Sequence, residues 1–217
     1  MSGREGDRVP GDGQQPETRF PGLATVERMV GLCRRTFLLN FGVVEPGAVY
    51  RCARPGRRLR GLVETYALTS VLDFERGFLS RDLGADSWGI AQVRAAGERS
   101  IDYYQFPMPF TRRPLREELL ALVMLFEHCR YPLLIHCETG ADRTGLAVGL
   151  YLMAVRGLHP EEAERRAFAP RFGHLPVLGT DHLHEPFREY AHWLGEHRFD
   201  PAPDRFRTWL EGVYQSR

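Results

Sequence analysis

The chain of 217 residues contains no lysine, because all 29 of its basic residues are arginine, and these face 28 acidic residues. The formal net charge is therefore only +1, so no strong overall field draws the chain toward nucleic acid or an anionic membrane. We attribute the missing lysine to the codon bias of a GC-rich, bacterial genome.

Long apolar runs are also missing. The longest apolar stretches, near 119–126 and 145–155, are too short to span a bilayer, and residues 1–7 lack the apolar core of a secretory signal. The four cysteines, at positions 33, 52, 129 and 137, follow the spacing of neither a disulfide framework nor a zinc site. We therefore expect a cytoplasmic protein with reduced thiols, no membrane span, no nucleic-acid partner, no metal and no other cofactor.

Short apolar strands alternate with helical patterns along the chain, which predicts one α/β domain. We expect a mostly parallel sheet of about four to five strands, flanked by helices, with extra helices at the C-terminus. Residues 1–20, rich in Gly, Pro and charges, are expected to be disordered, and 21–217 to form the domain. Strands are predicted near 41–44, 48–52, 70–74, 101–108 and 133–137, and helices near 25–35, 57–67, 88–96, 115–130, 160–168, 181–195 and 203–214.

The segment from Leu133 to Gly145 carries the clearest chemical pattern. It consists of a buried strand that ends at Cys137, a seven-residue turn and an apolar helix that begins near Leu146. Backbone N–H groups of such a turn, at a helix N-terminus, form a cradle for an anion such as phosphate. The same field lowers the pKa of a cysteine at its centre, and a thiolate held under a bound phosphate is a nucleophile facing phosphorus.

Spacing alone does not identify this site. With this many cysteines and arginines, roughly half a Cys-x5-Arg match is expected by accident, and Cys52 and Arg58 supply one. That copy contains Pro55, which has no N–H for a cradle, and Leu59 follows its arginine. The pattern at Cys137 instead combines a strand, a histidine, a glycine, an Arg-Thr pair and a helix.

These features resemble the active-site loop of the cysteine-dependent protein tyrosine and dual-specificity phosphatases, with the sequence His136-Cys137-x5-Arg143-Thr144-Gly145. The resemblance covers about 40–195. It includes Tyr50-Arg51-Cys52-Ala53-Arg54-Pro55, which is similar to the first strand of atypical dual-specificity phosphatases, including bacterial ones, except that Cys52 replaces a serine.

The resemblance implies a role for each residue of the loop. Cys137 attacks phosphorus, Thr144 stabilises the cysteine thiolate as a leaving group, and His136 orients the loop. The phosphate is held by Glu138, Thr139, Gly140, Ala141 and Asp142 through the backbone, and by Arg143 through its guanidinium. The two histidines of His182-x-His184 face apart on a helix, which does not favour a metal site.

The general acid departs from the family pattern, because the loop at 109–114, where an aspartate is usual, has no carboxylate. Asp102 begins the preceding strand, about 20 Å from its catalytic end, and is rejected. Asp142 lies in a Gly-x-Asp-Arg-Thr arrangement that resembles myotubularin-type lipid phosphatases, for which a loop aspartate has been proposed as the acid. Asp142 either donates the proton or only orients the loop, and Asp181 and Glu185 are outside candidates.

Three further residues carry predictions about substrate and regulation. Arg112 and Arg113 either contact the substrate or form a solvated face. Acidic residues in the phosphate loop would repel a cluster of phosphates, which favours a singly phosphorylated substrate such as a phosphoprotein. Cys52 either forms a reversible, protective disulfide with Cys137 or is a small buried side chain on a strand.

The residues together predict a metal-independent phosphomonoesterase that works through a phosphocysteine intermediate, most simply a protein tyrosine or dual-specificity phosphatase. Its partner would be a phosphorylated protein or a small phosphomonoester. Three alternatives stay open: a phosphoinositide or inositol-phosphate phosphatase, a catalytically silent phosphate-binding module, and, more distantly, a rhodanese-like sulfur transferase.

Overall fold

The computed structural model describes residues 39–75, 101–175 and 179–215. The predicted disorder at 1–20 and the predicted helices at 25–35 and 88–96 lie outside these residues. Among the helices of the described ranges, none combines the length and the apolar character that a membrane span requires.

The centre of the protein is a five-stranded sheet with the order β1-β2-β5-β3-β4. Its strands are β1 (Gly42–Glu45), β2 (Val49–Ala53), β3 (Ser70–Asp73), β4 (Asp102–Gln105) and β5 (Leu133–Cys137). Only β1 runs antiparallel to its neighbour, and the other four strands are parallel, as predicted. Parallel strands end at one edge, so Ala53 and the end of β3 lie beside Cys137, where ligands bind in such sheets.

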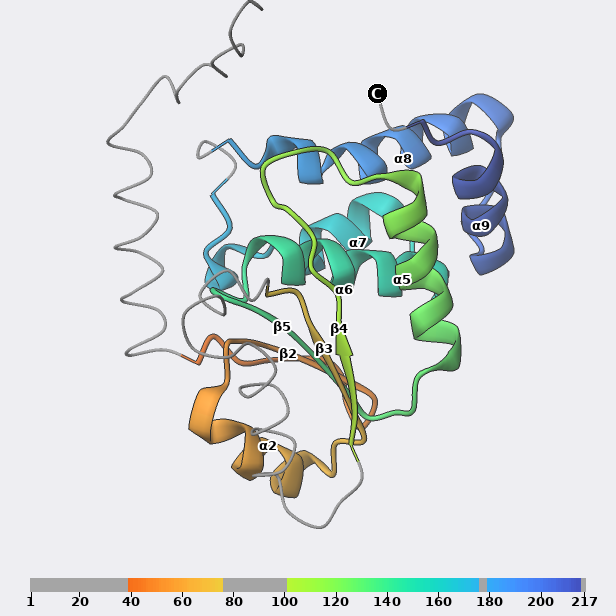
Figure 1. The fold of residues 1–217 in the computed structure, drawn as a ribbon. Coiled ribbons are helices and arrows are strands. Elements are labelled where there is room, and N and C mark those ends of the chain that lie inside the picture. The colour runs from red at the N-terminus through yellow and green to blue at the C-terminus, as the bar shows by residue number, and fades with distance from the viewer. Residues whose placement is uncertain (1–38, 76–100, 176–178, 216–217) are drawn as a thin grey trace, which may run out of the picture.

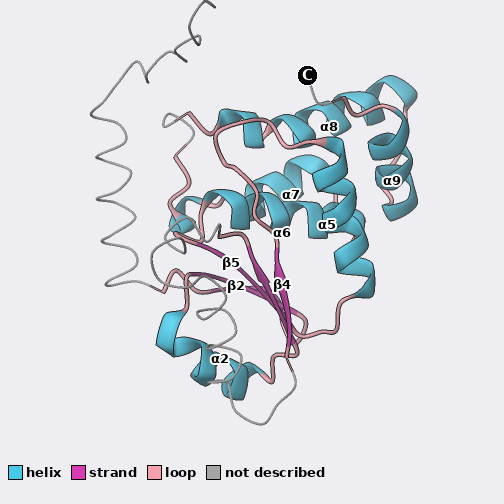
Figure 2. Cartoon of the chain, in the orientation of Figure 1, coloured by secondary structure: helices cyan, strands magenta, loops and turns pink. Residues whose placement is uncertain are grey.

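Helices cover both faces of the sheet (Figures 1 and 2). On one face lies α2 (Leu59–Tyr66), preceded by the short 3-10 turn η1 (Gly56–Arg58). On the other face lie α5 (Arg116–His128), α6 (Asp142–Ala154), α7 (Pro160–Ala167), α8 (Glu185–His197) and α9 (Pro203–Gly212), with 3-10 turns η2 (Pro170–Phe172) and η4 (Asp181–Leu183). This arrangement confirms the predicted fold class, including the additional C-terminal helices.

Each face has its own apolar core because side chains alternate along a strand. Leu133, Ile135 and Cys137 belong to the cluster on the α6 face, whereas Cys52 and Leu134 belong to the cluster under α2. Helix α6 is buried along nearly its whole length, which explains its continuous apolar sequence. This central position fixes the start of α6, and therefore the loop 138–141, against the end of β5.

Two predicted boundaries were wrong near the site. Helix α6 begins at Asp142, not near Leu146, so the turn between strand and helix is only 138–141. Strand β4 ends at Gln105, three residues before the predicted end. Polar residues, Asp142 to Thr144, occupy the first turn of α6, and apolar periodicity cannot detect a turn of that composition.

Candidate active site

Cys137 is the last residue of β5, and only 1% of its surface is exposed. The loop that follows turns back over the cysteine at Gly140, whose φ of 71° is in the left-handed region that favours glycine. A Cβ at Gly140 would lie 2.6 Å from the backbone nitrogen of Ala53. The glycine therefore allows the loop to press against the end of β2, beside the thiol.

The first turn of α6 supplies backbone donors that the helix itself does not use. The N–H of Gly145 is the first that bonds back into the helix, to the carbonyl of Ala141 at 2.8 Å. The preceding amides, of Asp142, Arg143 and Thr144, are those that a helix start leaves without an intrahelical acceptor. These amides are the donors that the predicted anion cradle would use, and the cradle itself stays a prediction.

The side chain of Arg143 reaches the backbone segments that follow β3 and β4. Its Nη1 donates to the carbonyl of Phe74, just after β3, at 2.6 Å, and lies 3.5 Å from the carbonyl of Met108. The guanidinium carbon lies 5.5 Å from the ring centroid of Phe110. A guanidinium has five N–H donors, so an arginine anchored through Nη1 keeps other donors for phosphate oxygens.

Thr144 is fully buried, and its Oγ1 has no hydrogen-bond partner among the described residues. A buried hydroxyl without a partner is unusual and calls for an explanation. Thr144 follows Arg143 in the first turn of the helix that faces Cys137, so its hydroxyl is available to donate to a thiolate.

Arg51 is a residue of the site whose role the sequence did not reveal. It projects from β2 on the Cys137 face, where it is 1% exposed, and its Nη2 donates to the carbonyl of Gly140 at 2.7 Å. Its Nη1 donates to the carbonyl of Ala167 at 2.5 Å, and its guanidinium stacks 3.7 Å from the ring centroid of Phe172. Burial lowers the pKa of Arg51 to about 10, so it stays charged at neutral pH behind the loop.

His136 lies on the opposite face of the sheet from Cys137. Its Nδ1 lies 3.7 Å from the carboxylate of Asp73, and its ring nitrogens have no hydrogen-bond partner among the described residues. Burial lowers the pKa of His136, so the ring is neutral at physiological pH. The predicted role in orienting the loop stays a prediction.

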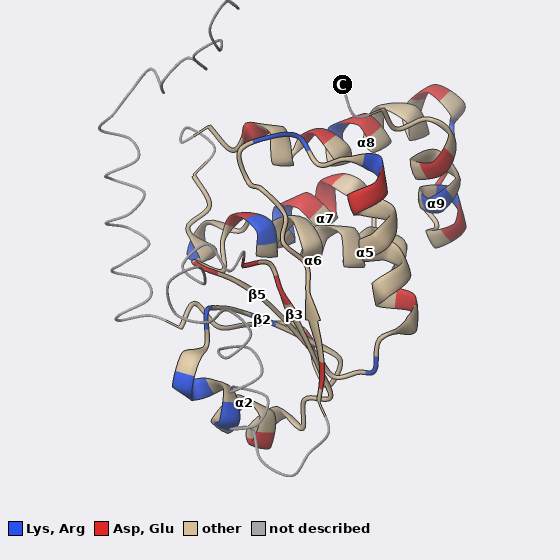
Figure 3. Cartoon of the chain, viewed as in Figure 1, with Lys and Arg blue, Asp and Glu red and all other residues tan. Residues whose placement is uncertain are grey.

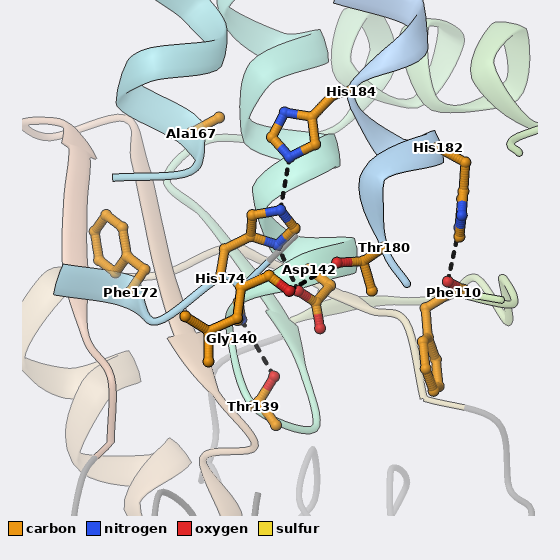
Figure 4. A network of polar contacts seen from close by, with 12 residues as sticks. Phe110, Thr139, Gly140, Asp142, Ala167, Phe172, His174, Thr180, His182 and His184 are labelled. Atoms are coloured by element: carbon orange, nitrogen blue, oxygen red, sulfur yellow. Dashed lines mark hydrogen bonds and ion pairs between the residues drawn. The ribbon is translucent and has the colours of Figure 1, made fainter. Parts of the chain in front are cut away.

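Asp142 is bonded to a histidine that the sequence did not single out. Its Oδ1 lies 2.6 Å from Nδ1 of His174, which follows η2, and His174 in turn contacts His184 (Figure 4). The rejection of Asp102 agrees with the register, because Asp102 and Leu133 both pair with Ser70, at the strand ends far from Cys137.

The other candidate acids differ in their surroundings. A hydrogen bond from Arg188 lowers the pKa of Asp181, which disfavours an acid role, and Glu185 is paired with Arg113. Glu75 lies just beyond β3, and burial raises its pKa. Glu75 is also paired with Arg54, and neither its burial nor this pairing can be read from the sequence.

The arginine pair of the loop before α5 has protein partners. Arg112 forms a two-armed ion pair with Glu118, and Arg113 contacts Glu185 and Glu189 on α8. Figure 3 shows this basic loop running alongside the acidic residues of α8. Contacts to a substrate stay a prediction that would require these pairs to open.

Cys52 and Cys137 lie on neighbouring strands, but their side chains lie on opposite faces of the sheet. Cys52 pairs with His136 in the ladder, and its side chain belongs to the cluster under α2. A disulfide with Cys137 would require the backbone to move, because the two Cβ atoms point to opposite faces. Cys52, Cys129 and Cys137 are all free thiols.

Comparisons with known proteins agree with this geometry. The sequence model of the tyrosine phosphatase family matches residues 89–163, which contain the loop. The fold is similar to that of TpbA from P. aeruginosa, solved in complex with pTyr, with a TM-score of 0.56, 18% identity, and coverage of 80% of this chain and 91% of that one.

Two further solved structures have the same fold. Tk-PTP in its active form has a TM-score of 0.53 and 21% identity, over 69% of this chain and 97% of that one. A putative phosphatase from Shewanella putrefaciens has a TM-score of 0.51 and 15% identity, over 69% of this chain and 91% of that one. At these identities the likeness establishes the fold.

Proposed function

We propose that this chain, a cysteine-dependent phosphatase of the tyrosine phosphatase family, dephosphorylates phosphotyrosine or related monophosphorylated residues in proteins through a phosphocysteine at Cys137. The observation that carries the proposal is a buried cysteine at the end of β5, joined by the short loop 138–141 to the start of the buried helix α6. The complex of TpbA with pTyr supports phosphotyrosine as the substrate class.

The first chemical step uses groups that the fold already holds in place. The Cys137 sulfur attacks phosphorus, while the amides of the loop and the guanidinium of Arg143 bind the equatorial oxygens. The hydrogen bond that Arg143 donates to the carbonyl of Phe74 holds the guanidinium in place before the substrate binds. The leaving oxygen takes a proton from Asp142, and the alcohol or phenol departs.

The second step regenerates the thiolate. Water attacks the phosphorus of phosphocysteine, gives its proton to Asp142, and the sulfur leaves as the S–P bond breaks. The Thr144 hydroxyl, buried and without another partner among the described residues, donates to the departing thiolate. The sum of the two steps is hydrolysis of a phosphomonoester by one water molecule, with no metal required.

The substrate assignment follows from charge within the loop. Glu138 adds negative charge close to the phosphate, which favours one phosphate over several adjacent ones. Arg112 and Arg113, which would have offset that charge, are already paired with carboxylates. A phosphotyrosine peptide is therefore a better match than a polyphosphorylated inositol.

The test is turnover of p-nitrophenyl phosphate by the wild type and by Cys137→Ser, with and without EDTA. We expect wild-type activity that EDTA does not change, and no activity from the folded variant, because serine is not ionised at neutral pH. The control is Cys129→Ser, which alters a cysteine at the end of α5. Substantial hydrolysis by folded Cys137→Ser would refute the mechanism, and no wild-type turnover would leave phosphate binding as the function.

A second assay addresses the substrate class. Phosphate release from a phosphotyrosine peptide, a phosphoserine peptide and a phosphoinositide would be compared at equal concentration. We expect the highest kcat/KM for the phosphotyrosine peptide. A clear preference for the phosphoinositide would instead support the lipid phosphatase alternative.

A further inference from the structure

Four titratable side chains form a continuous line from the phosphate loop to the far side of α7. Asp142 Oδ1 lies 2.6 Å from His174 Nδ1, His174 Nε2 lies 2.6 Å from His184 Nε2, and His184 Nδ1 lies 2.5 Å from Glu164 Oε1. Figure 4 shows His184 above His174 and His174 above Asp142, joined through their ring nitrogens. The residues come from different parts of the chain: the start of α6, the segment after η2, the residue between η4 and α8, and α7.

The middle of this line is enclosed, whereas its ends reach solvent. The side chains of His174 and His184 are 2% and 8% exposed, compared with 28% for Asp142 and 24% for Glu164. The ring of Phe168 lies 4.4 Å, centroid to centroid, from each imidazole. Water has little access to the imidazole nitrogens, so the three links depend on one another for hydrogen bonding.

The number of protons in the line follows from its geometry. Three links between heteroatoms need three protons, one in each. Two neutral imidazoles supply two protons, so the third must reside on a carboxyl group or as a second proton on an imidazole. If Asp142 carries it, Glu164 is ionised, and if Glu164 carries it, Asp142 is ionised. Moving each proton across its own link converts one arrangement into the other.

We infer that Glu164, His184 and His174 form a proton-sharing chain that holds the acid proton on Asp142 and positions that carboxyl over the thiol. This inference rests on the proposed function. Asp142 is the group that gives its proton to the leaving oxygen and takes one from water in the second step. His174, His184 and Glu164 are positioning residues that act through Asp142, and no proton is gained or lost by the line over a complete turnover.

Loss of the third proton would leave one link unmade between enclosed nitrogen atoms, which is costly. An aspartate alone at a helix start would be ionised at neutral pH, since the dipole there favours the anion. Proton sharing with two imidazoles is what allows an acid to sit inside the anion cradle.

The charges around the line are of known sign. Cys137 and Arg51 lie toward the Asp142 end, and they also influence each other. Asp181 acts on His184, and Arg188 acts on Glu164. Asp181 and Arg188 are paired with each other at 2.9 Å, and this pairing lowers the pKa of Asp181. Arg51, Asp181 and Arg188 therefore keep their charge across the neutral range.

The test compares His184→Gln with His192→Gln. Glutamine reaches roughly the position of the distal imidazole nitrogen and keeps a contact to His174, but an amide cannot pass a proton on to Glu164. His192 is an exposed residue of α8, with a side chain 75% exposed, so it controls for the same chemical change. Both variants would be checked for folding by circular dichroism and thermal unfolding.

We expect His184→Gln to lower kcat/KM by about 10–100-fold on phenyl phosphate, a fraction of a full general-acid contribution, and only about 2-fold on p-nitrophenyl phosphate, whose leaving group needs no acid. The descending limb of its pH profile on phenyl phosphate should move to lower pH. Glu164→Gln, at the solvent end of the line, should lower kcat/KM on phenyl phosphate by a smaller factor. It tests the inference in place of His184→Gln if that variant does not fold.

Several outcomes would overturn the inference. These are equal losses on both substrates, an unchanged pH profile in both variants, or wild-type activity that EDTA removes and zinc restores, which would make the imidazoles metal ligands. The proposed function fails separately, through activity of Cys137→Ser. If Cys137→Ser is inactive and His184→Gln behaves as the wild type, the proton-sharing chain is refuted and the proposed function stands.

Discussion

Consecutive residues of the same strand have opposite surroundings, because their side chains lie on different faces of the sheet. On the α6 face, the buried cation Arg51 is bonded to a carbonyl of the loop that follows Cys137. On the α2 face, Cys52 and His136 are enclosed and neutral, since burial raises the pKa of Cys52 and lowers that of His136. Arg51 and Cys52 are consecutive, as are His136 and Cys137.

This difference shows that two consecutive residues of a strand can serve different purposes, one in the candidate site and the other in the apolar core. Alternation places every second residue on the other face, so neighbours in sequence experience different surroundings. The α6 face stabilises ions with the helix start and a buried arginine, whereas the α2 face offers only an apolar cluster with few polar partners. A substitution should therefore affect catalysis on one face and only stability on the other.

The largest expected effect in this comparison is that of Asp142→Asn. The amide keeps the size of the side chain but cannot donate a carboxyl proton, so we expect a loss of about 10²–10⁴-fold on phenyl phosphate. The loss on p-nitrophenyl phosphate should be much smaller. Steady-state kinetics on both substrates across pH would measure the difference.

Glu138→Gln is the matched control, because it changes another carboxylate of the same loop. It should alter both substrates by the same factor, since Glu138 is not one of the four residues of the histidine line. Equal losses on both substrates for Asp142→Asn would show that Asp142 only positions the loop. Glu75, with its raised pKa, would then become the next residue to substitute.

Arg51→Met should separate activity from stability. The loop carbonyls of Gly140 and Ala141 lose a donor, and we expect kcat/KM to fall roughly 10–100-fold, the size of one lost hydrogen bond to a charged group. Removing a cation whose pKa is about 10, well below its usual 12.5, relieves a desolvation cost on the order of 3 kcal/mol. These effects oppose each other in folding, so the free energy of unfolding should change by less than about 2 kcal/mol.

Denaturant unfolding and steady-state kinetics would be measured together for Arg51→Met, with Arg60→Met as the control. Arg60 lies on α2, where it pairs only with the exposed Glu64 among the described residues. A large loss of stability with full activity in the folded fraction would contradict this account. That outcome would make Arg51 a structural residue of β2.

Gly140→Ala tests the contact between the loop and the end of β2. Alanine would need a φ of 71° and would bring a Cβ to 2.6 Å from the backbone of Ala53, so we expect a loss of roughly 1–3 kcal/mol. Gly47→Ala is a control with a φ of 76° and no atom within 4 Å of the new Cβ. It should cost about 1 kcal/mol, and equal losses in chemical denaturation would mean that no clash occurs.

The fold and the centre of the site could be predicted from the sequence because their signals are local. Cys137, Arg143 and Thr144 lie within eight consecutive residues between an apolar strand and an apolar helix. Helix α7 was predicted almost to the residue, since Pro160 and two acidic residues mark its start. The predicted start of helix α6 lies after the observed one, because the first turn of the helix carries the polar residues of the site.

The partners of the site could not be predicted because their contacts join distant residues. His174 is 32 positions from Asp142, and Arg51 is 89 positions from Gly140. The pattern His182-x-His184 was weighed only as a metal site. In the structure His184 joins the histidine line, while His182 contacts the carbonyl of Phe110. Single residues in irregular segments leave no periodic signal.

The smallest expected effect is that of Cys52→Ala on the α2 face. Burial, and then the nearby Cys137, raise the pKa of Cys52 well above its ordinary 9.0, so the thiol stays protonated in the folded state. In the unfolded chain it ionises above about pH 9. The folded state then holds one more proton than the unfolded state, and stability must fall as pH rises through that range.

We therefore expect the free energy of unfolding of the wild type to fall more steeply than that of Cys52→Ala between pH 9 and pH 10. The difference in slope should approach about 1.4 kcal/mol per pH unit. Near pH 7 the variant should keep its activity within about 2-fold and lose about 1 kcal/mol of stability, the cost of a small cavity. Urea unfolding at several pH values would measure both quantities. Parallel stability curves would show that Cys52 ionises in the folded protein, and the α2 face would then not be the neutral side of the sheet.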